Sequence, residues 1–171
     1  MAADLEPKSH GAEPGGALAE LAAVFAGRAR GWGIFEDRFG RLKRSFRIDI
    51  IGRYTGTALV IDEAFVYGDG ARENRTWHVV SLGGGRFRGT CPDCVGEAIG
   101  EVDAAGVIRM RYAFRLAMKA RSLVVDFDDR IYRIDGGRAI NRATVTKWGV
   151  TLGTVSLFLE RLADQSPRRA A

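Results

Sequence analysis

The sequence is poor in cysteine and histidine and holds no long apolar run. Its longest uninterrupted apolar run, Leu21 to Ala26, is far shorter than the roughly 20 residues that a membrane-spanning helix needs. No basic segment leads into an apolar one near the start of the chain, so we expect no secretory signal. Both cysteines lie deep in the chain, so we expect no lipid attachment at an N-terminal thiol. These absences predict a cytoplasmic protein.

The two cysteines have the CxxC spacing of redox proteins, in the segment Cys91-Pro92-Asp93-Cys94. In redox proteins this motif lies at a helix N-terminus, which lowers the pKa of the first thiol. Here the surrounding residues predict strand and turn, so we expect inert or weakly redox-active thiols that pair only under oxidising stress. A structural zinc site needs four ligands, and the only histidines are His10, near the start, and His78. We predict no metal site and no cofactor.

No complete catalytic motif is present either. His78 stands on a predicted strand with no serine or cysteine nucleophile beside it, so no catalytic triad can be assembled. Gly83-Gly84-Gly85 lacks the following Lys-Ser/Thr pair and helix of a phosphate loop. The acidic cluster Asp126–Asp129 lacks the spacing and the glycine of a calcium loop, and we interpret it as a turn that caps backbone donors. The sequence therefore leans against an enzyme without excluding one.

Composition and charge fit one globular domain. The 171 residues are 46% hydrophobic and 27% charged, and the net charge of +5 is spread along the chain. Nucleic-acid binding is not expected, because it usually requires clustered basic residues with aromatic residues between them. Five arginines on two predicted strands form a basic outer stripe: Arg86, Arg88, Arg109, Arg111 and Arg115. This stripe is either a solvated surface or a site of weak, peripheral attachment to anionic lipid head groups.

The chain divides into a leader, a domain and a tail. Residues 1–16, with several prolines and glycines, predict a disordered leader. Residues 17–27 predict one short amphipathic helix, because apolar residues recur there at helical spacing and Gly27 is placed to end it. Residues 17–162 are interpreted as a single domain and 163–171 as a charged tail.

After the helix, apolar residues recur at every second position, which is typical of a sheet with one buried and one wet face. The clearest case is residues 107–116, where Ile108, Met110, Tyr112, Phe114 and Leu116 share one side. Glycine-rich turn signals separate the runs. We predict a mostly β fold: an antiparallel barrel of about eight or nine strands with one short N-terminal helix. A two-layer sandwich is the alternative.

The hairpin around Gly68-Asp69-Gly70 predicts a strand register. A three-residue loop keeps the apolar residues of both strands on one face, whereas a two-residue turn would mix polar and apolar residues there. The predicted pairs are Leu59 with Val79, Ile61 with Trp77, and Glu63 with Arg75. Glu63 and Arg75 therefore lie side by side on an otherwise apolar face.

Two interpretations of the Glu63–Arg75 pair stay open. The pair is either a structural ion pair or a polar anchor that meets the head of a ligand in an apolar cavity. An inward face with Tyr112, Phe114 and Phe127 would suit an acyl chain in the second case. These aromatic residues fit a plain packed core equally well.

The sequence also resembles a bacterial family known as domain of unknown function 3833 (DUF3833), from about Phe25 to Glu160. The resemblance is carried by the segments Trp32–Gly40, Asp62–Tyr67, Arg75–Trp77, Asp128-Asp129, Asn141–Ala143 and Lys147–Gly149. It implies a lipocalin-like (calycin-type) barrel and a connection with fatty-acid modification, because members tend to be encoded beside genes for that chemistry. It implies no activity.

The chain departs from the family pattern in two places. Cys91 and Cys94 stand where aliphatic or small residues are usual, and Arg130-Ile131 stands where a Trp-Met pair is expected. Some members are lipoproteins, which this sequence does not resemble at its start. The departures weaken a role for the thiols and for the positions after Asp129.

Three functional hypotheses follow. The first is a module that binds a lipid or other apolar ligand. The second is an accessory protein, with a filled core, that partners a lipid-modifying enzyme. The third is an enzyme that acts on a lipid with Glu63 as general base, which requires a raised pKa that Arg75 opposes by favouring the ionised form. The candidate ligand-binding residues are Glu63, Arg75, Trp77, Tyr112, Asp128 and Asp129.

Overall fold

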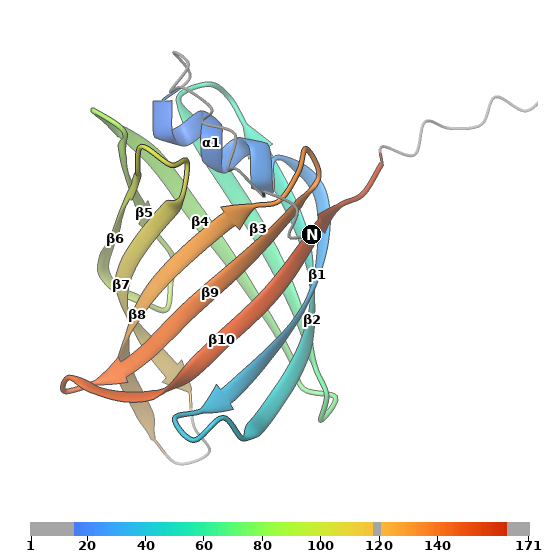
Figure 1. Cartoon of the computed structure of the whole chain (residues 1–171), viewed down its shortest axis with the longest axis vertical. Helices are drawn as coiled ribbons and strands as arrows, with labels where there is room; N and C mark the ends of the chain where they lie inside the picture. The colour runs from blue at the N-terminus through green and yellow to red at the C-terminus, as the bar shows by residue number, and fades with distance from the viewer. Residues whose placement is uncertain (1–15, 118–120, 164–171) are drawn as a thin grey trace, which may run out of the picture.

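The computed structural model describes residues 16–117 and 121–163 as one helix and ten strands (Figure 1). The elements are α1 (Gly16–Phe25), β1 (Gly27–Asp37), β2 (Leu42–Tyr54), β3 (Ala58–Tyr67), β4 (Arg72–Gly83), β5 (Arg86–Thr90), β6 (Cys94–Val102), β7 (Ile108–Ala117), β8 (Ser122–Arg133), β9 (Arg138–Lys147) and β10 (Val150–Arg161). The fold is therefore mostly β, as the two-residue periodicity predicts.

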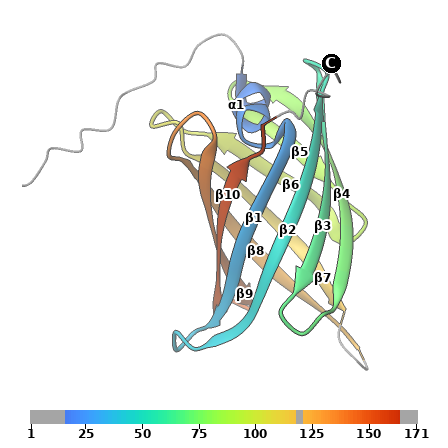
Figure 2. The ribbon, with the colours of Figure 1, turned by 90° about the vertical axis from the view of Figure 1, so that its right-hand side faces the viewer.

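The ten strands form a closed antiparallel barrel. Each strand pairs with its neighbours in sequence, and β1 also pairs with β10 from Ala29 opposite Arg161 to Asp37 opposite Gly153. Figure 2 shows this closing seam. Closure removes the exposed strand edges that an open sheet would present. The barrel prediction is confirmed over the sandwich alternative.

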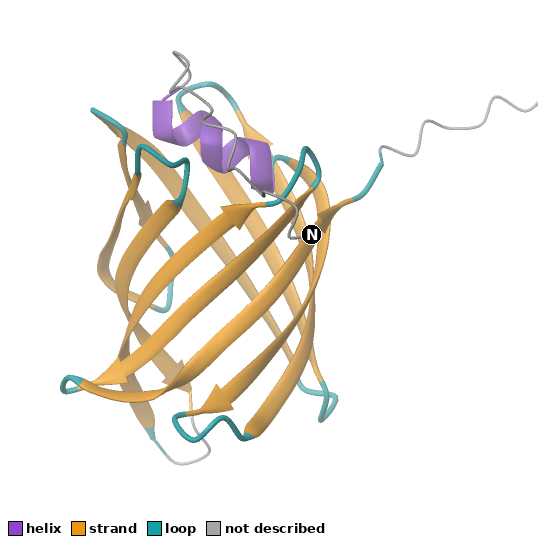
Figure 3. Ribbon diagram, in the orientation of Figure 1, coloured by secondary structure: helices purple, strands orange, loops and turns teal. Residues whose placement is uncertain are grey.

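Helix α1 lies across one end of the barrel (Figure 3). Its apolar residues Leu18, Leu21, Ala22 and Phe25 are all buried, as the helical spacing predicts. The end of the helix packs directly on β2 at Gly52, where a Cβ atom would lie 1.8 Å from the carbonyl oxygen of Phe25. Glycine is required at this position because the backbones touch there.

The described residues contain no helix with the length and apolar character that crossing a membrane demands.

The inward faces of the strands carry the predicted apolar residues. Ile48, Ile50, Leu59, Ile61 and Val79 are at most 4% exposed and form, with α1, the core of the helix-covered half. The register of β3 with β4 pairs Glu63 with Arg75 and Ile61 with Trp77, which confirms the hairpin prediction. The turn chemistry around Gly68-Asp69-Gly70 thus determines which side chains enter the barrel.

The expected count of eight or nine strands is wrong, because the structure has ten. The least regular strands have small residues at inward positions, so they show little apolar alternation. Gly33 in β1 lies under the ring of Phe46, and Gly100 in β6 lies under the ring of Phe87. In β9 two inward positions are Ala139 and Ala143. At Gly33 and Gly100 a neighbouring aromatic ring occupies the space that a larger inward side chain would fill, so the alternating pattern lacks an apolar residue there.

The prediction of a turn at the acidic cluster Asp126–Asp129 is wrong, because the cluster lies inside β8. Strand geometry sends alternate residues to opposite faces, so Asp126 points outward and Asp129 is buried. The predicted leader lies outside the described residues except for Gly16, which begins α1, and the predicted tail lies outside them except for Ala163.

The turn between β9 and β10 places a tryptophan in an unfavourable conformation. Trp148 and Gly149 form its two central positions, with φ values of 51° and 77°, as in a type I′ turn, for which Asn-Gly is preferred. A left-handed conformation costs a non-glycine residue roughly 1 kcal/mol, and the Trp148 side chain is 88% exposed.

We expect Trp148→Asn to raise the free energy of unfolding by roughly 0.5–1 kcal/mol in urea denaturation. An unchanged or lower stability would contradict this assignment of strain.

Candidate functional site

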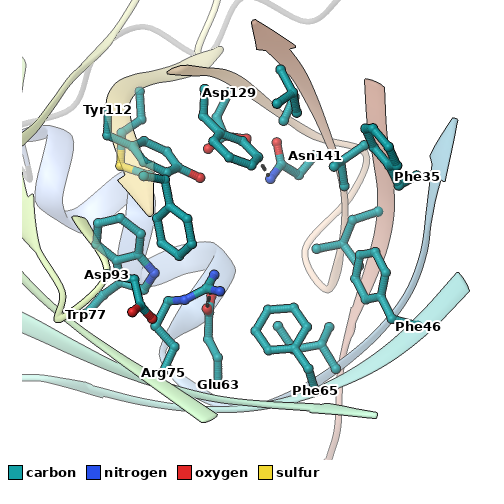
Figure 4. Close-up of a pocket in the computed structure, with 18 of the residues that line it drawn as sticks. Phe35, Phe46, Glu63, Phe65, Arg75, Trp77, Asp93, Tyr112, Asp129 and Asn141 are labelled. Carbon is teal, nitrogen blue, oxygen red and sulfur yellow. Dashed lines mark hydrogen bonds and ion pairs between the residues drawn. The ribbon is translucent and has the colours of Figure 1, made fainter. Parts of the chain in front are cut away.

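The barrel encloses a cavity of about 800 Å³. Leu21 and Phe25 line it at the end covered by α1, and Lys43, Arg44 and Arg115 line it at the opposite end. Much of its wall is apolar and includes Phe35, Phe46, Phe65, Phe114, Phe127, Val145 and Val155. Figure 4 shows that polar side chains from opposite walls point into this space. The interior is therefore hollow, and its polar groups are concentrated at a few positions.

The first polar cluster is centred on Arg75. Its Nη1 atom lies 3.7 Å from Oε2 of Glu63, and its Nη2 atom lies 2.6 Å from Oε1 of Glu73. Only 13% of each side chain of the Glu63–Arg75 pair is exposed. The closer ion pair is thus with Glu73, two residues along β4, whereas Glu63 is held loosely.

Aromatic residues complete the surroundings of Arg75. The guanidinium carbon lies 4.3 Å from the ring centre of Phe114 and 5.1 Å from that of Phe65, within cation–π range. The Tyr67 hydroxyl donates a 2.8 Å hydrogen bond to Glu73 and so orients that carboxylate. Within the described residues, the buried Nε atom of Arg75 has no hydrogen-bond partner. This donor is enclosed by protein atoms and does not face the open cavity.

The second polar cluster lies across the cavity from Arg75 and Glu63 (Figure 4). Asp129 on β8 is only 3% exposed. Its Oδ1 atom accepts a 3.3 Å hydrogen bond from Nδ2 of Asn141 on β9, and the Tyr112 hydroxyl on β7 also donates to this carboxylate. The Oδ1 atom of Asn141 is buried and finds no partner in the part of the chain that the structure describes. This acceptor is likewise enclosed by protein atoms.

Burial shifts the pKa of both inward carboxyl groups upward. Desolvation raises the pKa of Glu63 from 4.5 to about 7, although Arg75 and a hydrogen bond from Trp77 act against the shift. Desolvation also raises the pKa of Asp129 from 3.8 to about 6 against its hydrogen bonds with Tyr112 and Asn141. Arg75 thus lowers the pKa of Glu63, as predicted, but desolvation outweighs this ion pair of 3.7 Å.

Five of the six candidate residues line the cavity: Glu63, Arg75, Trp77, Tyr112 and Asp129. Asp128 does not. It points to the outer face of β8, where its carboxylate accepts a 3.0 Å ion-paired hydrogen bond from Nε of Arg111. Neighbouring residues of one strand cannot both face inward, so the acidic pair contributes one residue to the cavity and one to the surface.

The sequence reasoning missed two residues of the site. Glu73 lies opposite Phe65 in the register that pairs Glu63 with Arg75, so the predicted register already places Glu73 on the inward face. Asn141 gave no such signal, because it lies between the small residues Ala139 and Ala143 on the inward face of β9. Its role becomes visible only when β8 and β9 pair and bring it beside Asp129.

The CxxC thiols lie at the turn between β5 and β6. The Cys94 amide donates to the Cys91 carbonyl at 3.1 Å, and both thiols are unbridged and half-buried. Burial raises the pKa of Cys91, and it raises that of Cys94 to about 11. Protonated thiols are poor nucleophiles and poor metal ligands. Among the described residues, no three His, Cys, Asp or Glu side chains gather as a metal site would require.

The predicted outer stripe of arginines is largely paired with carboxylates. Arg109 lies 3.3 Å from Asp103, Arg111 3.0 Å from Asp128, and Arg88 3.0 Å from Glu97. These exposed pairs neutralise much of the positive charge on β5 and β7. The stripe therefore resembles an ordinary solvated wall more than an anion-binding surface.

Comparison with protein families identifies the chain. The model of the family described as "Protein of unknown function (DUF3833)" matches residues 9–161, most of the chain. The chain belongs to the DUF3833 family. The resemblance seen in the sequence is thereby confirmed. No curated protein matches the chain at a significant level.

Two solved structures resemble this DUF3833 protein at low sequence identity. The S-type phycobiliprotein lyase CPES from Guillardia theta is 9% identical, with a TM-score of 0.60, over 82% of this chain and 89% of the lyase. The structure of EF1p2_mFAP2b bound to DFHBI is 10% identical, with a TM-score of 0.46, over 85% of this chain and 99% of that one. The likeness to the lyase shows that the two proteins share a closed, mostly antiparallel β-barrel fold.

The shifted carboxyl groups make stability depend on pH. Because the folded-state pKa values of Glu63 and Asp129 lie near 7 and 6, the stability that these groups contribute is present below their unfolded pKa values and is lost as pH rises through the folded ones. We expect the stability of Glu63→Gln/Asp129→Asn, relative to the native protein, to rise by roughly 4 kcal/mol from pH 5 to pH 8. Urea denaturation across this range measures the difference, and a pH-independent difference would show that the pKa values are ordinary.

Proposed function

We propose that this DUF3833 protein binds a lipid or other apolar molecule inside the barrel. The observation that carries the proposal is the cavity of about 800 Å³, with an aromatic and aliphatic wall and polar groups from opposite sides. Sites for small molecules have typical volumes of about 300–1,000 Å³ and combine apolar walls with a few placed polar groups. The hollow interior argues against the alternative of an accessory protein with a filled core. The connection with fatty-acid modification stays a prediction from the family resemblance.

The polar groups favour a ligand whose head is uncharged. Arg75 already contacts Glu63 and Glu73, and Asp129 faces them across the cavity. A carboxylate head would add a further negative charge to a desolvated site with one central guanidinium, which is unfavourable. A hydroxyl or amide head instead donates and accepts hydrogen bonds without adding charge, so it suits walls that carry both a guanidinium and carboxyl groups. An acyl alcohol or amide fits this pattern better than a free fatty acid.

The head-group preference can be tested with two ligands of equal chain length. Hexadecanol and palmitate are titrated at pH 8 against the protein loaded with a fluorescent naphthylamine probe. We expect the alcohol to displace the probe at a concentration at least about ten-fold lower than palmitate, because only palmitate places a charge beside the carboxylates. Equal or stronger displacement by palmitate would overturn the proposed head chemistry.

A matched pair of variants tests whether the ligand lies inside the barrel. Val155 on β10 lines the cavity, whereas its neighbour Thr154 points the other way. We expect Val155→Trp to weaken hexadecanol binding at least about ten-fold by filling space, while Thr154→Trp leaves it unchanged. Circular dichroism establishes that both variants are folded. Equal effects of the two substitutions would contradict binding in the cavity.

One observation favours an enzyme as the second candidate. A general base works best with a pKa near the working pH, and burial raises the pKa of Glu63 to about 7. In this case Glu63 removes a proton from a lipid held in the cavity. The hypothesis requires that Glu63→Gln keeps ligand binding and abolishes chemical change of the bound ligand. Mass spectrometry of the ligand after incubation measures that change, and identical products from both proteins would exclude it.

A further inference from the structure

Two exposed aromatic residues stand at the end of the barrel opposite α1. Phe39, in the turn between β1 and β2, is 68% exposed, and Trp148, in the turn between β9 and β10, is 88% exposed. Leu42 and Val150, at the adjoining strand starts, are 63% and 52% exposed. The two turns are neighbours, because the Arg38 amide donates to the carbonyl of Leu152 at 3.0 Å. They form one apolar rim, defined by Phe39, Leu42, Trp148 and Val150.

Basic side chains flank both aromatic tips. The guanidinium carbons of Arg38 and Arg41 lie 4.7 and 5.6 Å from the ring centre of Phe39, and Nζ of Lys147 lies 4.9 Å from that of Trp148. Within the described residues, no carboxylate lies within 4.0 Å of the guanidiniums of Arg38 and Arg41. This differs from the outer arginine stripe, where Arg109 and Arg111 pair with aspartates. The rim thus keeps positive charge that the stripe loses.

The rim borders the mouth of the cavity on one side. Asp37, Lys43 and Leu152 are all cavity-lining residues, and they belong to the strand ends that carry the rim. Helix α1 covers the other end and packs its apolar face inside. A molecule that leaves or enters along the barrel axis therefore passes the rim.

The conformation of Trp148 is a further sign that the exposed side chain has a function. With φ at 51° it occupies a left-handed turn position where asparagine or glycine is favoured. Strain of this kind is most often retained at functional positions. A solvent-exposed indole contributes little packing that would offset the strain.

We propose that the rim docks on an anionic lipid bilayer, with Phe39 and Trp148 inserted among the head groups and Arg38, Arg41 and Lys147 against the phosphates. Aromatic rings concentrate at the membrane interface, and clustered basic residues add attraction to anionic lipids. Docking turns the cavity mouth toward the membrane, so a lipid can pass between bilayer and barrel without crossing water. The surface does not depend on the identity of the cavity ligand, and a vesicle assay measures it separately.

The test is sedimentation of the full chain with vesicles of phosphatidylcholine alone and of phosphatidylcholine mixed equally with phosphatidylglycerol. We expect binding to the anionic vesicles, a blue shift of tryptophan emission, and quenching of that emission by brominated lipids. Phe39→Ser/Trp148→Asn should lower the partition coefficient by at least about ten-fold. The variant should remain folded, because both side chains lie mostly in solvent.

Trp32→Ala is the matched control. Trp32 is 48% exposed on the outer wall of β1, away from the rim, and stacks on Phe158. Its removal should leave the partition coefficient unchanged, and Arg38→Gln/Arg41→Gln should weaken binding only to the anionic vesicles. The proposal is overturned if the chain fails to bind anionic vesicles, or if Trp32→Ala weakens binding as much as the rim variant does. Hexadecanol binding by the rim variant shows independently whether the cavity still functions.

Discussion

The pairing of β1 with β10 is the contact on which the rest of the structure depends, because it converts a ten-stranded sheet into a continuous wall. About eight strands give a barrel just wide enough for side chains to fill, and a wider one leaves internal space. Aromatic and aliphatic side chains together with α1 close the helix-covered end, and the cavity extends from there to the opposite end of the barrel. The cavity is therefore a consequence of strand number and closure.

Removing the inward polar groups from bulk water costs free energy, and this cost explains why they contact other polar groups. Glu63, Arg75 and Asp129 are removed from bulk water, so each contacts other polar groups, and Arg75 is additionally surrounded by aromatic rings. Desolvation still outweighs these contacts and raises the pKa of both carboxyl groups. A ligand with an uncharged polar head supplies hydrogen bonds without adding charge to this environment.

Much of the fold was predictable because strand periodicity and turn chemistry are local. The loop at Gly68-Asp69-Gly70 determines the register that places Glu63 beside Arg75, and alternation in residues 107–116 identifies the inward face of β7. Gly33 hid the periodicity of its strand because the ring of Phe46 occupies the space there, and Ala143 hid that of β9 because a small side chain marks the inward face only weakly. The cluster of Asp129 with Asn141 was not predictable, since it depends on the pairing of β8 with β9. Nor was the pKa of Glu63, which depends on burial as well as on its neighbours.

The central claim is that the barrel holds an apolar ligand with an uncharged head. Native mass spectrometry of the protein purified from its own host, followed by extraction and identification of any bound molecule, tests this claim most directly. We expect a single equivalent of a neutral amphipathic molecule with a long apolar chain, absent from the Val155→Trp variant. Protein that is empty as isolated and stays empty after exposure to alcohols, amides and fatty acids of several chain lengths would contradict it.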